Sequence, residues 1–536
     1  QEASARGTHC PKADSVGFED DRDQTAQGIP MNEVPENAGL APTRITDEIF
    51  FIDLTNKQLP TISPGILSLE YLEELHMENN LIVSIPRDIN CLRHMKGLYL
   101  DQNHIRDISK EQGERKRLPS LDLSNNPLFC SSLPDTSKLQ WLRQSRFNKT
   151  NLREIPEQIC EYLHHVELLG LSDNDLKCLP KEIVYLTKLK EIYLQKNRFK
   201  SFLKDLCHIA DLEIDLEQNL TSLIPEEVGF LTNLVKLLLA FNNLSSIPLT
   251  PQHCQKLAVL DLSHNLLHKL PPGLKNLTEM RVLKLSANSL EKFPHQICWL
   301  PLSCVYLRNT RLHEVPGSFS RLTSVRILEL SENCFYEIPK GICTMKNLEV
   351  LALDGNQIQE AFIPAEVREL TSLKCLSLSE NQLSSFPREI FLLESLERLY
   401  LGQDKGIKFR SLPEDISKLK NLKELHMENN CLEYLPAAIG LLTHLKIPDC
   451  CSHLLKQLPD SLCHVQGKNS LQKLLLQNHQ LSQLPEDLDS LQQLELVLVD
   501  GNPMADPQTG VCCQGTSAIW EYLGEKRCKR AMNLKI

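Results

Sequence analysis

Two stretches of the sequence, residues 72–86 and 422–436, share the core Glu-Leu-His-Met-Glu-Asn-Asn. In both stretches an apolar residue follows two positions after the second asparagine, and a proline follows six positions after it. A chain that repeats itself in this way is an array of one small unit, which buries its apolar face only by stacking against further copies. The shared pattern is L-x-x-L-x-L-x-x-N-x-L-x-x-L-P-x-x-I, and it predicts a fold that grows by adding units.

The unit recurs along most of the chain. About twenty units follow one another, mostly 23 residues apart, and the units near Ser145 and Pro448 are degenerate. The first residues of the successive apolar pairs are Ile52, Leu75, Leu98, Leu121, Ser145, Leu169, Ile192, Ile214, Leu237, Leu260, Leu283, Val305, Leu328, Leu351, Leu376, Leu399, Leu425, Pro448, Leu474 and Val497.

Each unit has a strand part and a helix part. The alternation in L-x-L predicts a short strand with one buried face, and stacked strands would form a parallel sheet on the inner curve of a horseshoe. The segments beginning Pro225-Glu-Glu, Pro413-Glu-Asp and Pro485-Glu-Asp place proline at the first helical position and acids in the first turn. We therefore expect a helix of about two turns on the convex face of each unit, which makes the fold class an α/β solenoid.

An asparagine follows most of the strands. Its amide can both donate and accept hydrogen bonds, so we expect it to turn inward and satisfy backbone groups of the buried turn. These structural asparagines are Asn80, Asn103, Asn126, Asn174, Asn197, Asn242, Asn265, Asn288, Asn333, Asn356, Asn381, Asn430 and Asn502.

Three segments are expected along the chain. Residues 1–44 are polar and predict a flexible arm, residues 45–503 form the solenoid, and residues 504–536 form a helical cap with a basic helix. Within the cap, Ile519, Trp520 and Leu523 have the spacing of one apolar helix face. Residues 130–153, 359–363, 405–410, 447–453 and 463–469 depart from the repeat, either as contact loops or as tolerated irregularities.

The composition narrows the class of partner and compartment. A net charge of −11 disfavours nucleic acids and anionic membranes and favours basic or mixed-charge protein surfaces. The 19 cysteines are scattered singly through the array, which is typical of reduced thiols in the cytoplasm. No secretory apolar segment and no apolar run of about 18 residues occurs, so we expect neither export nor membrane insertion.

The sequence contains no motif for catalysis. It lacks a phosphate-binding loop, a kinase motif set, an H-E-x-x-H or G-x-S-x-G sequence and a C-x-x-C pair. His76, His426 and the pair His164-His165 lack partners at ligand spacing and are interpreted as surface histidines. We therefore predict no enzyme activity, no cofactor and no metal site.

The positions beside the buried leucines are the candidate binding residues, because a solenoid usually binds through its concave face. Acidic side chains predominate there and aromatic side chains lie among them, which favours a basic, helical or extended protein segment over a merely solvated polar face. The predicted concave-face residues are Glu74, Glu78, Tyr99, Asp101, Tyr193, Glu213, Asp215, Glu217, Phe241, Tyr306, Tyr400, Glu424 and Glu428. The densest acidic patch is Glu213-Ile-Asp-Leu-Glu217.

The basic run near the C-terminus has two interpretations. Lys526, Arg527, Lys529 and Arg530 lie on the expected last helix, either as the solvated side of the cap or as a helix that binds a calmodulin-type or acidic partner.

The repeats over residues 45–523, with the ending Gly501-Asn-Pro-Met504 and Ala518-Ile-Trp-Glu-Tyr-Leu523, resemble intracellular leucine-rich-repeat proteins of the Ras-binding scaffold type. Among them the chain looks most like the leucine-rich repeat and IQ motif-containing family. That resemblance implies a cytoplasmic, non-catalytic scaffold. The alternatives are a regulatory subunit of a GTPase- or phosphatase-linked complex and a structural component of the cytoskeleton or ciliary axoneme. The IQ helix is not found up to residue 536, so calmodulin binding is expected only of a tail beyond it.

Overall fold

The computed structural model describes residues 48–106, 118–128, 142–155, 157–209, 211–248, 253–405, 408–450, 454–463 and 471–536. The predicted arm, residues 1–44, lies outside the described residues, as do residues 130–141, 406–407, 451–453 and 464–469 of the predicted irregular segments. The chain divides into two compact units between Val282 and Leu283. Each unit is described by itself below.

Short strands are the regular feature of both units. The unit up to residue 282 contains β1 (Phe51–Asp53), β2 (Glu74–His76), β3 (Gly97–Tyr99), β4 (Ser120–Asp122), β5 (Gln144–Arg146), β6 (Leu168–Gly170), β7 (Glu191–Tyr193), β8 (Glu213–Asp215), β9 (Lys236–Leu238) and β10 (Val259–Asp261). The division falls inside β11 (Val282–Lys284). The second unit contains β12 (Cys304–Tyr306), β13 (Ile327–Glu329), β14 (Val350–Ala352), β15 (Cys375–Ser377), β16 (Arg398–Tyr400), β17 (Glu424–His426), β18 (Ile447–Asp449), β19 (Lys473–Leu475) and β20 (Leu496–Leu498).

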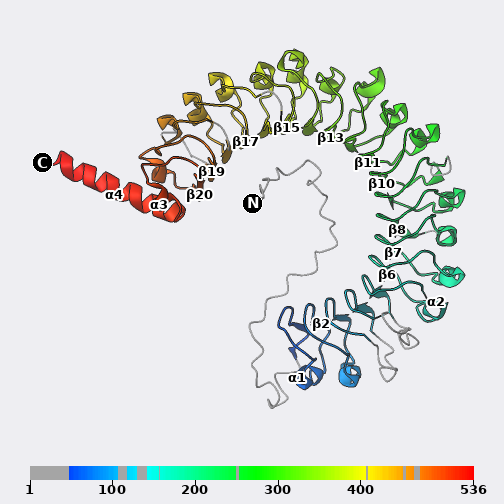
Figure 1. Ribbon diagram of the computed structural model, residues 1–536. Helices are drawn as coiled ribbons and strands as arrows, with labels where there is room; N and C mark the ends of the chain where they lie inside the picture. Colours follow the sequence, from blue (N-terminus) through cyan, green and yellow to red (C-terminus); the bar gives the residue numbers. More distant parts are fainter. Residues whose placement is uncertain are drawn as a thin grey trace, which may run out of the picture. The chain divides into compact units, whose positions relative to one another are not determined.

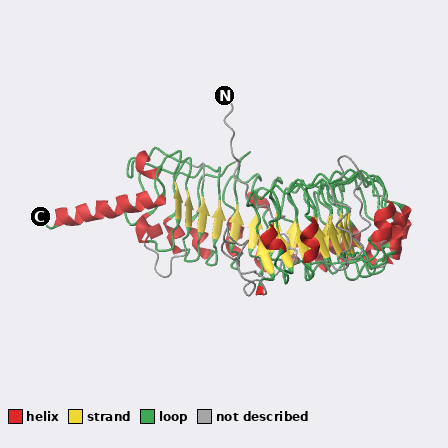
Figure 2. Cartoon of the chain, turned by 90° about the horizontal axis from the view of Figure 1, so that it is seen from below, coloured by secondary structure: helices red, strands yellow, loops and turns green. Residues whose placement is uncertain are grey.

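The strands form one parallel sheet of 20 strands. Within each unit every strand pairs with the next along the chain, so that Ile52 lies opposite Leu75 and Leu75 opposite Leu98. The predicted register is confirmed, because the first residue of each apolar pair is the middle residue of an observed strand. In each unit the strands lie side by side along the concave edge and the short helices along the convex edge (Figures 1 and 2). The fold is thus a leucine-rich-repeat solenoid with an inner parallel sheet.

The two degenerate units also contribute strands. Ser145 takes the buried middle position of β5, and Pro448 takes that of β18. Residues 447–453, which depart from the repeat in sequence, thus still contribute a strand over Ile447–Asp449, in the predicted register. Strand β18 still pairs with β17, with Pro448 opposite Leu425. Pro448 brings no N–H group, and the pairing of β18 with β19 is limited to Asp449 and Leu475.

The convex segments differ from the prediction of two-turn α-helices. Most are 3₁₀-helices of three to five residues, such as η7 (Glu226–Phe230). Pro225 is the N-cap of η7 rather than its first residue, and its carbonyl accepts from the N–H of Val228 at 3.2 Å. The residues on either side of this segment, Ile224 and Leu231, are both buried in the core, so only one tight helical turn fits between them.

The remaining helices have the following bounds. The α-helices are α1 (Pro64–Leu67), α2 (Glu157–Tyr162), α3 (Thr509–Cys512) and α4 (Thr516–Leu534). The other 3₁₀-helices are η4 (Arg87–Cys91), η5 (Lys181–Tyr185), η6 (Lys204–His208), η9 (Pro272–Asn276), η10 (His295–Trp299), η11 (Gly317–Arg321), η12 (Ile342–Thr344), η13 (Glu360–Phe362), η14 (Ala365–Glu369), η15 (Arg388–Leu392), η16 (Glu414–Lys418), η17 (Ala437–Leu441), η18 (Asp460–Cys463) and η19 (Leu488–Ser490).

A ladder of buried asparagines connects successive repeats, as predicted. All thirteen predicted asparagines are buried. Asn103 shows the pattern: its Nδ2 donates to the carbonyls of Met77 and Leu100, both at 3.0 Å, and its Oδ1 accepts from the N–H of Ile82 at 3.1 Å. Each amide therefore bonds to its own turn and to the turn of the preceding repeat, which aligns the strands.

The C-terminal cap is a helix packed on the last repeat. Helix α4 lies against β20 and η19, with Ile519 and Leu523 buried and Trp520 half-buried. The predicted apolar helix face is confirmed. The side chains from Cys528 onward are exposed.

Candidate functional site

The concave face of the unit up to residue 282 presents accessible carboxylates. Asp53 on β1 is exposed, and the Glu74 side chain on β2 is 47% exposed. The predicted residues on this face that are half-buried, and so still reach solvent, are Glu74, Glu78, Tyr99, Asp101, Tyr193, Glu213, Asp215 and Glu217.

Strands β7 and β8 hold the densest acidic patch. Glu191 lies opposite Glu213, and Tyr193 lies opposite Asp215. The Tyr193 hydroxyl donates to Glu191 Oε2 at 3.0 Å, and the Glu217 N–H donates to Asp215 Oδ1 at 3.1 Å. Carboxylates on two adjacent strands therefore share one face, and because such strands lie about 4.8 Å apart the arrangement suits a cationic ligand.

The first copy of the repeated motif forms a histidine cluster on β2, which we call the N-terminal histidine cluster (Glu74, His76, Glu78 and Tyr99). His76 Nδ1 lies 2.9 Å from Glu78 Oε1, and Nε2 lies 3.4 Å from Glu74 Oε2. Tyr99 stacks on the imidazole at 4.4 Å with an interplanar angle of 8°. Burial lowers the pKa of His76, but the two glutamates outweigh burial and leave the pKa raised.

The second copy forms the C-terminal histidine cluster (Tyr400, Glu424, His426, Glu428 and Asp449). Tyr400 stacks on the His426 ring at 4.6 Å and 4°. His426 Nδ1 lies 3.4 Å from Asp449 Oδ2, and Nε2 lies 3.8 Å from Glu424 Oε1. The imidazole is therefore held between a ring on β16 and a carboxylate on β18.

Protonation in the C-terminal histidine cluster is strongly shifted. Burial on its own lowers the pKa of His426, but Asp449 and Glu424 outweigh it and raise the pKa to about 9. Burial, with the nearby Asp449 carboxylate, raises the pKa of Glu428 to about 7. The imidazole in turn lowers the pKa of Glu424. The cluster thus gathers carboxylates around one cationic position.

The prediction that His426 is a surface histidine without partners is wrong. Its side chain is only 11% exposed, and Asp449 approaches it from the next strand. The two residues are 23 positions apart, which is the period of the repeat, so adding one period to each concave residue would have found the contact. The degenerate sequence around Pro448 concealed it.

The concave face of the second unit is more closed than predicted. Tyr306 and Tyr400, two of the predicted concave-face residues, are only 5% and 6% exposed. Glu329 is fully buried and accepts from the Ser331 N–H at 2.7 Å. Long side chains on neighbouring strands cover one another here. In the first unit, Phe241 lies in the turn after β9, 48% exposed and stacked on His264 at 4.0 Å.

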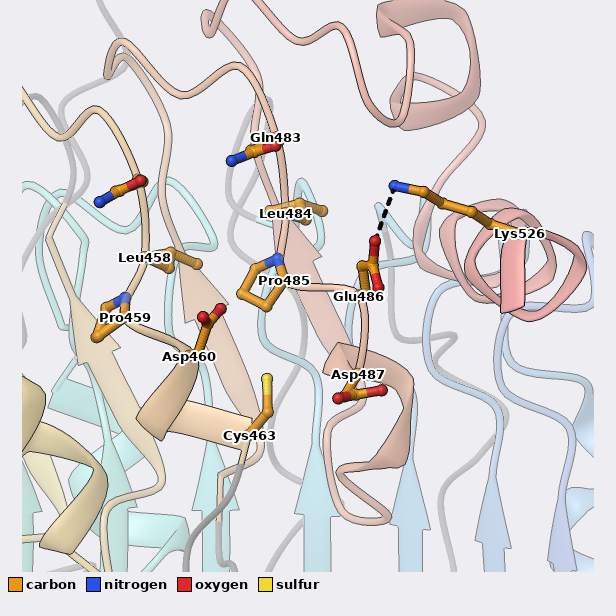
Figure 3. A pocket seen from close by; sticks show the side chains of 11 residues that line it. Leu458, Pro459, Asp460, Cys463, Gln483, Leu484, Pro485, Glu486, Asp487 and Lys526 are labelled. Carbon is orange, nitrogen blue, oxygen red and sulfur yellow. Dashed lines mark ion pairs between the residues drawn. The ribbon is translucent and has the colours of Figure 1, made fainter. Parts of the chain in front are cut away.

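The basic residues of α4 face acids of the last repeats. Lys526 bonds to Asp506 and lies 3.6 Å from Glu486 Oε1, beside a cleft of about 430 Å³ (Figure 3). Arg527 bonds to Asp489, and Arg530 bonds to Glu486. Lys529 is exposed. These ion pairs hold the cap helix against the last repeats. The second interpretation, that α4 binds a partner, stays a prediction.

Comparison with known proteins supports the leucine-rich-repeat fold, and over part of the chain it shows a higher sequence identity to one group of relatives. The family models named "Leucine-rich repeat region" and "Leucine Rich Repeat" match residues 317–426 and 256–277. The chain is 49% identical over 166 residues to leucine-rich repeat and IQ domain-containing protein 4 of Mus musculus, and 48% identical to that of Homo sapiens. The match covers 31% of this chain and 28% and 30% of those relatives, so the chain matches less than a third of their length.

Solved structures show the same fold. A leucine-rich-repeat protein of Leptospira interrogans is 25% identical with a TM-score of 0.54, covering 88% of this chain and 94% of that one. The plant peptide hormone receptor RGFR1 in complex with RGF2 is 25% identical with a TM-score of 0.52, covering 83% and 81%. Among the described residues, no helix combines the length and apolar character needed to cross a bilayer.

Proposed function

Because the chain is a leucine-rich-repeat protein, we propose that it is a non-catalytic scaffold that binds a protein segment of basic or mixed charge. The binding surface is the concave face of the unit up to residue 282. The observation that carries this proposal is two groups of accessible carboxylates on that face, one on β1, β2 and the turn after β3 and the other on β7 and β8, whereas β5 and β6 carry none. On the other unit, by contrast, Glu329 is buried.

The geometry favours an extended or helical segment. Strands in a parallel ladder lie about 4.8 Å apart, so a segment lying across β7 and β8 meets acidic positions on both strands. Tyr193 lies half-buried among the carboxylates and offers a ring face to Arg or Lys side chains, whereas one face of the Tyr99 ring is covered by His76. Peptide recognition by this fold has a precedent in the plant peptide hormone receptor, whose structure contains RGF2.

The test uses charge reversal within the densest patch. Glu213, Asp215 and Glu217 are changed together to Lys, and circular dichroism confirms folding. Partners are compared by affinity purification and mass spectrometry, and affinity is then measured with the purified partner. We expect affinity to fall about tenfold or more and to depend steeply on salt, because exposed ion pairs are weak singly but act together in steering and binding.

The matched control reverses the same number of charges on the convex edge of the same repeats. Glu182, Asp205 and Glu226 lie in the first turns of η5, η6 and η7. Their triple change to Lys alters the net charge equally but leaves the concave face intact. Equal partner loss in both variants, or no loss in the concave variant, refutes the proposed binding face.

Finer roles of the same scaffold are distinguished by what the partner is. A regulatory subunit of a GTPase- or phosphatase-linked complex would bind its partner in a nucleotide-dependent manner. A cytoskeletal or axonemal component would resist salt extraction. Calmodulin binding is expected only of residues beyond 536. A longer chain should therefore bind calmodulin, in the presence or absence of Ca²⁺, whereas residues 1–536 should not.

A further inference from the structure

The C-terminal histidine cluster contains three groups with the chemistry of metal ligands. One ligand atom each from His426, Glu428 and Asp449 lies within 4.8 Å of the others. Ligands about 2.1 Å from a tetrahedral ion are about 3.4 Å apart. The distance from His426 Nδ1 to Asp449 Oδ2 is 3.4 Å. Two of the groups are thus already at the spacing that a bound ion requires.

The surroundings of the imidazole fix which nitrogen faces the ion. Tyr400 stacks on the ring and holds its plane. Nδ1 faces Asp449, and Nε2 faces Glu424 Oε1 at 3.8 Å. A metal-bound histidine commonly directs its second nitrogen to a carboxylate, which orients the ring and increases its basicity. Glu424 takes that supporting position.

The N-terminal histidine cluster shows what the same motif looks like when its groups are internally satisfied. There the Thr55 hydroxyl lies 2.6 Å from Asp53 Oδ1 and 3.0 Å from Glu78 Oε2, and can donate its one proton to either, while the Thr55 N–H donates to Asp53 Oδ1 at 3.0 Å. His76 bonds to Glu78. The carboxylates nearest to His76 are therefore already bonded to protein donors.

Gly402 replaces that threonine in the second copy. A Cβ at Gly402 would lie 2.4 Å from Glu428 Oε1, so the carboxylate occupies the space where a side chain would be. Glu428 Oε2 is buried and accepts no hydrogen bond among the described residues. Buried polar atoms without a partner are costly and point to a missing ligand.

We propose that His426 Nδ1, Glu428 and Asp449 bind one divalent first-row transition metal ion, such as Zn²⁺, on the concave face. A nitrogen ligand with two carboxylates suits these ions better than Ca²⁺ or Mg²⁺, which prefer oxygen ligands alone. Three protein ligands leave one coordination position open. Because Asp449 and His426 are on different strands, the ion would also cross-link β17 and β18, where Pro448 weakens the ladder.

The test is a titration of the whole chain with Zn²⁺ and with Co²⁺, whose visible absorption distinguishes thiolate from nitrogen and oxygen ligation. We expect one tight site per chain without thiolate absorption. Glu428→Gln and Asp449→Asn should each weaken binding about tenfold or more, since each removes one ligand charge while keeping the side-chain shape. Glu78→Gln, the matched change in the N-terminal histidine cluster, should leave binding unchanged.

A second measurement requires no variant. Hydrogen exchange of the wild-type chain with and without Zn²⁺ should show protection in peptides that contain residues 424–449 and none in peptides that contain residues 74–101.

Binding that persists in the Glu428→Gln/Asp449→Asn double variant overturns the proposal, as does thiolate absorption from the single tight site. Absence of a saturable site, or protection confined to other segments, also overturns it.

Discussion

The asparagine ladder allows a sharp stability prediction at Asn333. Its Oδ1 accepts from the N–H groups of Thr310 and Leu312 at 2.9 and 3.0 Å. Its Nδ2 donates to the carbonyls of Leu307 and Leu330 at 2.8 and 2.9 Å. The donors and acceptors belong to two successive repeats, and the Asn333 side chain is buried among them.

Asn333→Ala removes the acceptor for two buried N–H groups. A buried donor left without a partner costs about 1–3 kcal/mol, so the loss should be about 2–6 kcal/mol. Asn347→Ala is the matched control in the neighbouring repeat. Asn347 is exposed and donates one hydrogen bond to the Thr323 carbonyl at 2.8 Å, so its loss should be about 0.5 kcal/mol or less.

Urea unfolding followed by circular dichroism measures the difference between the two variants. Repeat arrays need not unfold in a single step, so hydrogen exchange of peptides covering residues 304–335 locates the loss. We expect faster exchange there in Asn333→Ala and not in Asn347→Ala. If the two variants differ by less than about 0.5 kcal/mol, the ladder does not carry the stability assigned to it here.

Two further predictions concern the second unit. Burial raises the pKa of Asp354 to about 6 although Ser377 and Ser379 donate to it, so the folded state favours the protonated acid. The protonated Asp354 therefore stabilises the folded state by about 3 kcal/mol when the pH is below the pKa of Asp354 in the unfolded chain. This stabilisation is lost as the pH rises through about 6. As the pH rises from about 4 to about 7.5, the free energy of unfolding of Asp354→Asn, measured in urea titrations, should therefore increase relative to that of wild type. Glu314→Gln, at an exposed position, is the control and should show no such increase. A difference between Asp354→Asn and wild type that stays constant over this pH range contradicts the reasoning. Leu523→Ala in the cap should destabilise α4 and β20 by about 2–4 kcal/mol, because it leaves a cavity at a residue only 1% exposed. Met532→Ala, at 68% exposure, is the control, and equal exchange rates of residues 496–534 in both variants would show that α4 does not cover the last repeat.

The exposure of the concave side chains could not be read from the repeat pattern. Glu213 and Glu329 occupy equivalent sides of their strands, yet the first is half-buried and the second fully buried. The pattern predicts only the direction in which a side chain leaves its strand. Its exposure depends on how far the side chains of both neighbouring strands reach over it, and those neighbours are about 23 residues away in each direction.

The sequence by itself determined the array and its register. The buried middle residue of each strand, the inward asparagines and the apolar face of α4 all follow from local alternation and from a period that needs no distant information. Even Ser145 and Pro448 were placed correctly, because the intact units on either side set their positions.

Only the tertiary structure decided the helix type and the contents of the histidine clusters. The single tight turn of η7 results from the distance between two buried ends, which no local propensity encodes. His426 meets Asp449 because stacking places residues of successive repeats about 4.8 Å apart, whereas the sequence separates them by a full unit with a proline in the strand. The two copies of one seven-residue motif therefore acquire different chemistry from their neighbours, Thr55 in one and Gly402 in the other.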